Sequence, residues 1–226
     1  ARLTPKGPDG EDLIGASFTY DGLGTPLVFD GTPVDIPMDK LDSLQFKGPE
    51  HFKGKVTIEV RAVTIDYDDD DDTPSAPAES GYAELTNVIL QPVADEVTLA
   101  LSGLAKGTED LPIDLDIRPT SSDPSETFNV RISGIPADAE IHYDGNSTPL
   151  ALTGPDVDGT YSVIIEGFDS SADLTITPPP DSNDDFTLRV TAQSVDDPGV
   201  PELTLDTSDW ADEKSIRVEV EGVADG

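Results

Sequence analysis

Carboxylates are the residues whose number and spacing in this sequence could do chemistry. The 226 residues include 47 Asp and Glu against 13 Lys and Arg, for a formal net charge of −34 at pH 7. Carboxylate oxygens are the ligands that Ca²⁺ prefers, and the ion accepts them in loose geometry. So dense a charge also repels itself, which opposes compaction unless cations are present. The sequence therefore predicts Ca²⁺ as the cofactor.

The first candidate ligands gather in three short acidic phrases. They are Asp95 in PVADE, Glu109 and Asp110 in GTED, and Asp123 and Glu126 in DPSE. Strand ends and an interdomain linker can lie together at one end of a β-sandwich, and we expect the three phrases to converge there. For each residue, the alternative of an acid solvated in a loop stays open.

A fourth phrase has part of the pattern of an EF-hand. DSNDD (181–185) has the D-x-N-x-D spacing that opens such a loop. Phe186 stands where the loop needs Gly, and Ala192 stands where it needs a bidentate Glu. A true EF-hand is therefore excluded, and a partial Ca²⁺ loop around Asp185 remains a hypothesis.

The densest charge run is YDDDDDTP (67–74). Like charges at this spacing are typical of a solvated loop. Asp66 and Asp68, however, directly follow a predicted strand, as Asp196 does in the second half of the chain. We therefore keep Asp66 and Asp68 as candidate metal ligands and interpret the rest of the run as free.

Catalytic motifs are missing from the sequence. The two histidines, His51 and His142, have no Ser partner motif, and no GxSxG, P-loop or HExxH sequence occurs. There is no Cys, which excludes disulfides and thiolate chemistry. A carboxylate pair carries little information where acids are so common. We expect a protein that is not an enzyme.

Short apolar bursts with period-two alternation predict β-strands along the chain. They are VTIEVRAVTI (56–65), ELTNVIL (84–90), IDLDI (113–117), TFNVRIS (127–133), DLTIT (173–177), FTLRVTA (186–192) and SIRVEV (215–220). With 19 Gly and 20 Pro between them, no long amphipathic helix is expected. The predicted fold class is all-β, built from Ig-like β-sandwiches.

A repeated phrase divides the chain into two copies. ASFTYDGLGTPL (16–27) matches AEIHYDGNSTPL (139–150) at seven of twelve positions, and PVAD (92–95) matches GVAD (222–225). The pattern predicts two tandem domains, 1–95 and 96–226. The spacing between the two occurrences of the repeated phrase aligns Ala1 with residue 124, in the second copy. The first domain is therefore expected to be incomplete or split, without the early strands. Such a domain leaves an open sheet edge.

Charge and hydropathy also limit the partners. The net charge repels nucleic acid and anionic membranes. No apolar run is long enough to span a bilayer, and ARLTPKGPDG has no apolar signal core, so we expect no membrane insertion. With Ala first and a single Met, the chain is expected to be a piece of a larger protein.

Several phrases together resemble the cadherin-like repeats of giant bacterial RTX adhesins. They are GTEDLPIDLDI, DPSETFNVRISGIPADAEI, DLTITPPPDSNDDFTLRVTAQSVDD and VEVEGVADG in the second copy, with PEHFKGKVTIEVRA and PVAD in the first. Such adhesins are exported by type I secretion and anchored at the outer membrane of Gram-negative cells.

The resemblance implies a Ca²⁺-stiffened extender module in an extracellular fibre at the cell surface, supporting adhesion and biofilm formation. It adds Asp184 beside Asp185 to the ligands named above. The partners that it implies are neighbouring domains of the same fibre, with the chain itself a monomer. The first copy departs from the repeat in its missing strands and in its penta-Asp run.

Two other readings stay open. One is a ligand-binding module of the same adhesin type, which captures a glycan or a peptide. The other is a salt-adapted acidic surface protein without specific calcium sites.

Overall fold

The structure, a computed structural model, describes residues 1–65 and 76–224, and these residues are almost entirely β. In that part of the chain the one helical element is the 3₁₀ helix η1, Met38–Ser43. No helix among the described residues has the length and apolarity to cross a membrane. The predicted all-β sandwich class is confirmed.

Two compact units make up the chain. One contains residues 1–92 with 198–204, and the other contains residues 93–197 with 205–226. The predicted domain boundary at 95/96 stays a prediction.

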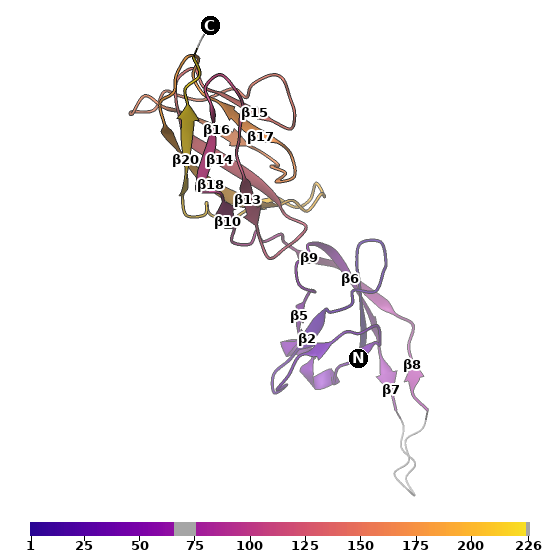
Figure 1. The fold of residues 1–226 in the computed structure, drawn as a ribbon. Coiled ribbons are helices and arrows are strands. Elements are labelled where there is room, and N and C mark those ends of the chain that lie inside the picture. The colour runs from indigo at the N-terminus through magenta and orange to yellow at the C-terminus, as the bar shows by residue number, and fades with distance from the viewer. Residues whose placement is uncertain (66–75, 225–226) are drawn as a thin grey trace, which may run out of the picture. The chain divides into compact units, whose positions relative to one another are not determined.

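Within residues 1–65 and 76–92, the first unit has nine strands in three sheets. They are β1 (Arg2–Lys6), β2 (Ser17–Thr19), β3 (Leu27–Val28), β4 (Val34–Asp35), β5 (Gln45–Lys47), β6 (Gly54–Arg61), β7 (Val63–Thr64), β8 (Ala78–Glu79) and β9 (Ala83–Leu90). The sheets have the orders β4-β1-β6-β9, β3-β2-β5 and β7-β8. Figure 1 shows β6 and β9 next to each other in this unit. Phe18, Phe29 and Val56 are fully buried in the core of this unit.

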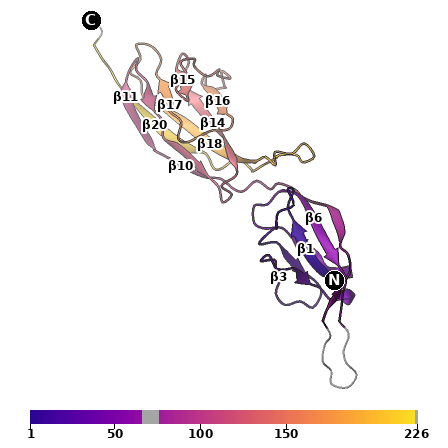
Figure 2. The ribbon, with the colours of Figure 1, turned by 90° about the vertical axis from the view of Figure 1, so that its right-hand side faces the viewer.

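The second unit is a larger sandwich, in which β14, β18 and β20 run side by side (Figure 2). Its strands are β10 (Thr98–Leu101), β11 (Leu104–Thr108), β12 (Ile113–Asp114), β13 (Ile117–Thr120), β14 (Thr127–Ile135), β15 (Glu140–Tyr143), β16 (Tyr161–Ile165), β17 (Leu174–Thr177), β18 (Phe186–Asp196), β19 (Asp206–Thr207) and β20 (Lys214–Glu221).

The two faces of this sandwich enclose one apolar core. One sheet has the order β11-β20-β18-β14-β16 with β19 beside β18, and the other face consists of β12-β17-β15 and β10-β13. Alternate side chains of a strand point to one side, so the period-two bursts place Ile132, Ile176 and Val218 in the core, where they are buried.

β14 carries a bulge at Gly134. The register with β16 shifts between Ser133 and Ile135, and Gly134 has φ of +77°. A Cβ atom there would lie 2.6 Å from the carbonyl oxygen of Thr187. Glycine is therefore required for β14 to stay paired with both neighbours.

One predicted strand is wrong in detail. IDLDI (113–117) was expected to form a single strand, but it is divided between β12 and β13. The cause is a change of partner, because β12 pairs with β17 whereas β13 pairs with β10. A segment that moves from one sheet to another interrupts its hydrogen-bond ladder.

The alignment of Ala1 with position 124 is also wrong. β1 pairs Leu3 with Val60, and β14 pairs Ile132 with Val190, the residue 130 positions after Val60. Leu3 therefore occupies the place of Ile132, and Ala1 that of Val130. The repeated phrase misled the alignment because the connection from β1 to β2 is longer than that from β14 to β15.

Candidate metal centre

Three buried carboxylates come together in the second unit. Asp123, Glu126 and Asp196 each offer one oxygen, and these oxygens lie within 4.8 Å of one another. The three residues are only 3%, 7% and 3% exposed. This acidic cluster could hold a metal ion.

A tight turn places the first two carboxylates on the same side. Asp123 Oδ1 accepts a hydrogen bond from the Ser125 amide at 2.7 Å, and the Asp123 carbonyl accepts one from the Glu126 amide at 3.3 Å. The Ser121 hydroxyl also donates to the Asp123 carbonyl, at 3.0 Å. An Asp side chain that bonds the backbone two residues ahead stabilises such a turn. The DPSE turn thus brings two of the three cluster carboxylates together.

The third carboxylate is supplied by the end of β18. Side chains alternate along a strand, so Asp196 points to the same side as Leu188, Val190 and Ala192, which are all fully buried. The inward-facing positions of β18 are therefore apolar at Leu188, Val190 and Ala192, and the last of them is the charged Asp196. This continued alternation is the sequence signal that could have placed Asp196 in the cluster, whereas its position after a strand alone could not.

Backbone amides at the start of the second unit face the same carboxylates. The Val93 amide donates to Asp196 Oδ2 at 3.0 Å, and the Asp95 amide donates to Glu126 Oε1 at 2.6 Å. Between them, the Ala94 amide donates to Asp206 Oδ2 at 2.9 Å. Three consecutive amides are thereby bound to three carboxylates, which holds residues 93–95 against the cluster.

Asp95 lies beside the cluster through its backbone. Its carbonyl accepts a hydrogen bond from the Ser194 hydroxyl at 2.5 Å, and its Oδ2 accepts one from Ser122 at 2.7 Å. The structure thus brings the predicted ligands Asp95, Asp123 and Glu126 into one region.

One oxygen of the cluster lacks a protein partner. Glu126 Oε2 is buried and receives no hydrogen bond from any described residue. A buried carboxylate oxygen without a partner is costly, and neighbouring carboxylates add like-charge repulsion. A hollow of about 170 Å³, lined in part by Asp123, Glu126 and Phe128, adjoins it. A cation would satisfy the oxygen and neutralise its neighbours.

The GTED pair lies elsewhere. Glu109 directly follows β11 and is buried, with its Oε1 accepting a hydrogen bond from the Val223 amide at 2.5 Å. Asp110 has φ of +62°, and its Oδ1 accepts a hydrogen bond from the Asp181 amide at 3.0 Å. These carboxylates therefore bind backbone amides at the end of β20 and before β18.

The loop before β18 contains Asp184 and Asp185. Asp185 accepts hydrogen bonds from the Arg217 guanidinium at 2.9 Å and from the Val220 amide at 3.0 Å. The bond from Arg217, followed by that from Val220, holds the pKa of Asp185 below its usual value. Asp184 is exposed. Whether these two residues bind an ion stays a prediction.

The expected convergence of the acidic phrases at one end of the sandwich is wrong. Asp185 immediately precedes β18 and Asp196 ends it. A strand rises about 3.3 Å per residue, so these two residues are separated by roughly 35 Å. GTED, which bonds to the segment before β18, therefore lies far from DPSE. Asp66 and Asp68 lie outside the described residues.

No protein-family model matches this chain, and no characterised protein shows significant sequence similarity to it.

Proposed function

We propose that this chain is a calcium-stabilised structural module of a bacterial cell-surface adhesin. The observation that carries the proposal is the buried, unpartnered Oε2 of Glu126, a residue that clusters with the buried carboxylates of Asp123 and Asp196. The resemblance of its phrases to RTX adhesin repeats supports the adhesin assignment. In this role the chain is extracellular, acts without catalysis, and joins neighbouring modules of one fibre to support adhesion and biofilm formation.

Calcium fits the donor set better than other common ions do. The cluster offers carboxylates only, and thiolates are absent from the chain. Zinc favours Cys and His, whereas calcium accepts oxygen ligands in irregular geometry. Magnesium requires a near-ideal octahedron and retains several waters. Asp123, Glu126 and Asp196 would therefore hold Ca²⁺, with backbone oxygens or waters completing the set.

Ion binding would be linked to folding. Calcium sites in extracellular modules have dissociation constants of about 10⁻⁴ to 10⁻³ M, so they fill outside a cell and empty in the cytoplasm. A site at tenfold excess over its dissociation constant stabilises the folded state by about 1.4 kcal/mol. Such a module would fold after export, where the ion offsets the repulsion within the cluster.

The site would also hold the first residues of the second unit. The amides of Val93 and Asp95 donate to Asp196 and Glu126. An ion that keeps these carboxylates charged and ordered keeps their hydrogen bonds to the backbone. Calcium would thus stiffen the chain segment that leads into the second sandwich.

The test is whether calcium reverses the effect of Glu126→Gln on the melting temperature. In EDTA the substitution removes one of three buried negative charges while leaving an acceptor for the Asp95 amide, so the melting temperature should stay constant or rise. In millimolar Ca²⁺ the same substitution removes a ligand and should lower it. The single tryptophan, Trp210, reports melting of the second unit by fluorescence.

Glu166→Gln is the matched control, because Glu166 is exposed and lies just beyond β16. It should respond to calcium as the parent does. NaCl at matched ionic strength separates binding from screening. Equal melting temperatures in CaCl₂ and matched NaCl would exclude the calcium site and favour the salt-adapted surface protein.

A further inference from the structure

One arginine of the second unit has no carboxylate partner, although acids outnumber bases by 47 to 13 in this chain. The other arginines all form ion pairs, and they are Arg2, Arg61, Arg118, Arg189 and Arg217. Arg131 forms no ion pair with any described residue, and its Nε is buried without a hydrogen-bond partner among them. A partly buried, unneutralised guanidinium is costly, so its surroundings favour an anion.

Trp210 holds this guanidinium in place without satisfying its N–H donors. The Thr191 hydroxyl donates to the Ala211 carbonyl at 2.6 Å, and the Ala211 amide donates to the Ala192 carbonyl at 2.8 Å, which fixes the segment beside β18. The guanidinium carbon of Arg131 lies 4.1 Å from the centre of the Trp210 ring. A cation over an indole face is attracted to it but gains no hydrogen-bond acceptor. Arg131 is therefore positioned and still able to donate.

A hollow of about 450 Å³, lined in part by Arg131, lies on the outer face of the large sheet. Its floor is formed by β14, β16 and β18, whose register places Ser162, Ser133 and Arg189 in one row across the sheet. Arg131 and Thr191 are paired in a second row. The floor therefore offers hydroxyl groups and guanidinium N–H donors.

Two carboxylates also line the hollow. Asp156 lies in the loop before β16, and Glu213 directly precedes β20. Glu213 Oε1 is 3.9 Å from Arg189 Nε, and Asp158 Oδ2 is 3.5 Å from Arg189 Nη2, which are long distances for charge-assisted hydrogen bonds. The hollow thus combines donors with acceptors. Ligand pockets of this size are usually lined mainly by apolar residues, so a lining that is polar throughout suits a ligand rich in hydroxyl groups.

We propose that this hollow binds a saccharide unit that carries a carboxylate, of the uronic acid class. The carboxylate pairs with the guanidinium of Arg131, because charge-assisted hydrogen bonds from arginine to carboxylates are strong and geometrically specific. The ring hydroxyls bind the serine hydroxyls of the floor and the carboxylates of Asp156 and Glu213. The site uses none of the cluster carboxylates, so it does not rest on the proposed calcium role.

Isothermal calorimetry with matched sugars tests the proposal. The probes are the methyl glycosides of glucuronic, galacturonic and mannuronic acid, each compared with its neutral parent sugar in millimolar Ca²⁺. At least one uronide should bind at least about tenfold more tightly than its neutral parent, because only the acid has a carboxylate for Arg131. The proposal is overturned if no uronide binds more tightly than its neutral parent.

Two further carboxylates test whether the sugar itself is recognised. Acetate and N-acetylglutamate should both bind more weakly than the best uronide, because neither has ring hydroxyls for the rest of the hollow. Acetate of equal affinity would show a site for any small anion. N-acetylglutamate of equal or higher affinity would assign the hollow to a peptide carboxylate. Either result overturns the saccharide proposal.

Variants locate the site. Arg131→Gln should weaken binding of the best uronide at least about tenfold and leave the neutral sugar unaffected. Ser162→Leu fills the hollow from β16 and should weaken the same binding while Arg131 stays intact. Arg118→Gln, at an exposed arginine of β13, is the matched control and should bind the uronide as the parent does.

Melting followed by Trp210 fluorescence verifies that each variant keeps the second unit folded. A melting temperature lowered by Arg131→Gln together with an unchanged affinity for the uronide would show that Arg131 only supports Trp210. That result, or full binding by Ser162→Leu, would overturn the proposal.

Discussion

The two units share a strand framework, since β1, β6 and β9 pair in the order of β14, β18 and β20, and they differ in how completely their cores are buried. In the second unit, residues 96–129 provide β10 to β13, which cover the core, and the loop with Asp123 and Glu126. In the first unit Val88 and Leu90 of β9 are only partly buried, whereas Val218 and Val220, at the matching places on β20, are buried. In the second unit, one stretch of chain thus covers the core and supplies two of the three carboxylates of the acidic cluster.

The largest expected difference between the units concerns their cores. Val218→Ala should destabilise the second unit by about 2 kcal/mol, because it removes fully buried methyl groups and leaves a cavity. Val88→Ala should destabilise the first unit by less than about 1 kcal/mol, since Val88 is only partly buried. Trp210 fluorescence follows the second unit in denaturant, and amide hydrogen exchange in β6 follows the first. Equal losses would show that the first core is closed.

Calcium should slow amide exchange at the start of the second unit and leave exchange in the first unit unchanged. At tenfold excess over the dissociation constant, the amides of Val93 and Asp95 should exchange about tenfold more slowly, because they donate to the ligating carboxylates. Amides of β6 in the first unit should not change. A uniform slowing in both units would instead indicate ionic screening. Mass spectrometry of peptides that cover residues 93–95 and β6 makes the measurement.

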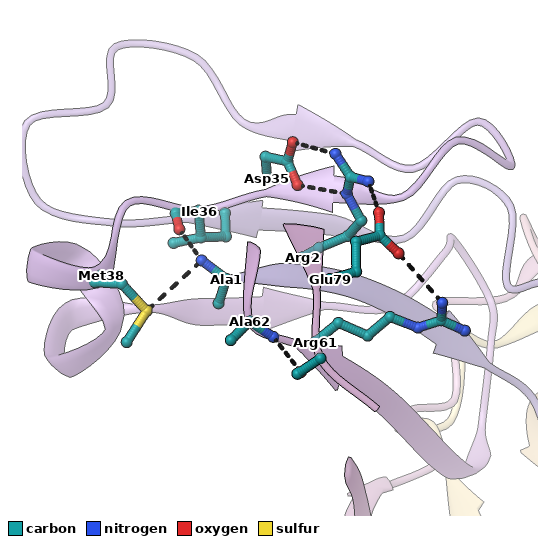
Figure 3. A network of polar contacts seen from close by, with 9 residues as sticks. Ala1, Arg2, Asp35, Ile36, Met38, Arg61, Ala62 and Glu79 are labelled. Carbon is teal, nitrogen blue, oxygen red and sulfur yellow. Dashed lines mark hydrogen bonds and ion pairs between the residues drawn. The ribbon is translucent and has the colours of Figure 1, made fainter. Parts of the chain in front are cut away.

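The smallest expected difference is in the response to acid. Each unit has an Asp whose pKa is held down by an Arg: Asp35 by hydrogen bonds from Arg2, and Asp185 by hydrogen bonds from Arg217 and the Val220 amide (Figure 3 shows Asp35). A lowered folded pKa contributes stability above the ordinary value of 3.8, and this contribution is lost as the pH falls through the folded value.

Asp35→Asn and Asp185→Asn should therefore lower the melting temperature of their own unit at pH 6, with the deficit shrinking as the pH falls below about 4. Asp173→Asn, at an exposed residue, is the control. A deficit that is independent of pH would contradict the assigned cause. A response confined to one unit would mean that the two Arg–Asp pairs are not equivalent.

Strand positions were largely predictable because alternation is a local property. SIRVEV (215–220) lies within β20, and ELTNVIL (84–90) lies within β9. The repeated phrase also folds alike in both copies, since the amides of Leu23 and Asn146 close the turn after Tyr20 and Tyr143 in the same way. The division of IDLDI was not predictable, because it results from a change of partner strand that no local pattern records.

Two of the three residues of the acidic cluster were predictable for the same reason. Asp123 and Glu126 stand three residues apart in one turn, so their proximity follows from local chain geometry. Asp196 lies 70 residues further on and reaches them only through the pairing of β14 with β18. GTED and the loop before β18 have equally suggestive compositions, but the length of β18 separates them from this cluster.

The sequence by itself determined the all-β class, the repeat and the excess of acids, since each depends on residue type and on short-range periodicity. The tertiary structure decided which carboxylates meet, which one keeps an unpartnered oxygen, and where Ala1 stands within its strand. These depend on strand register and on the partners that each edge finds. Contacts between residues far apart in the chain form only when the whole sandwich does, and no local pattern encodes them.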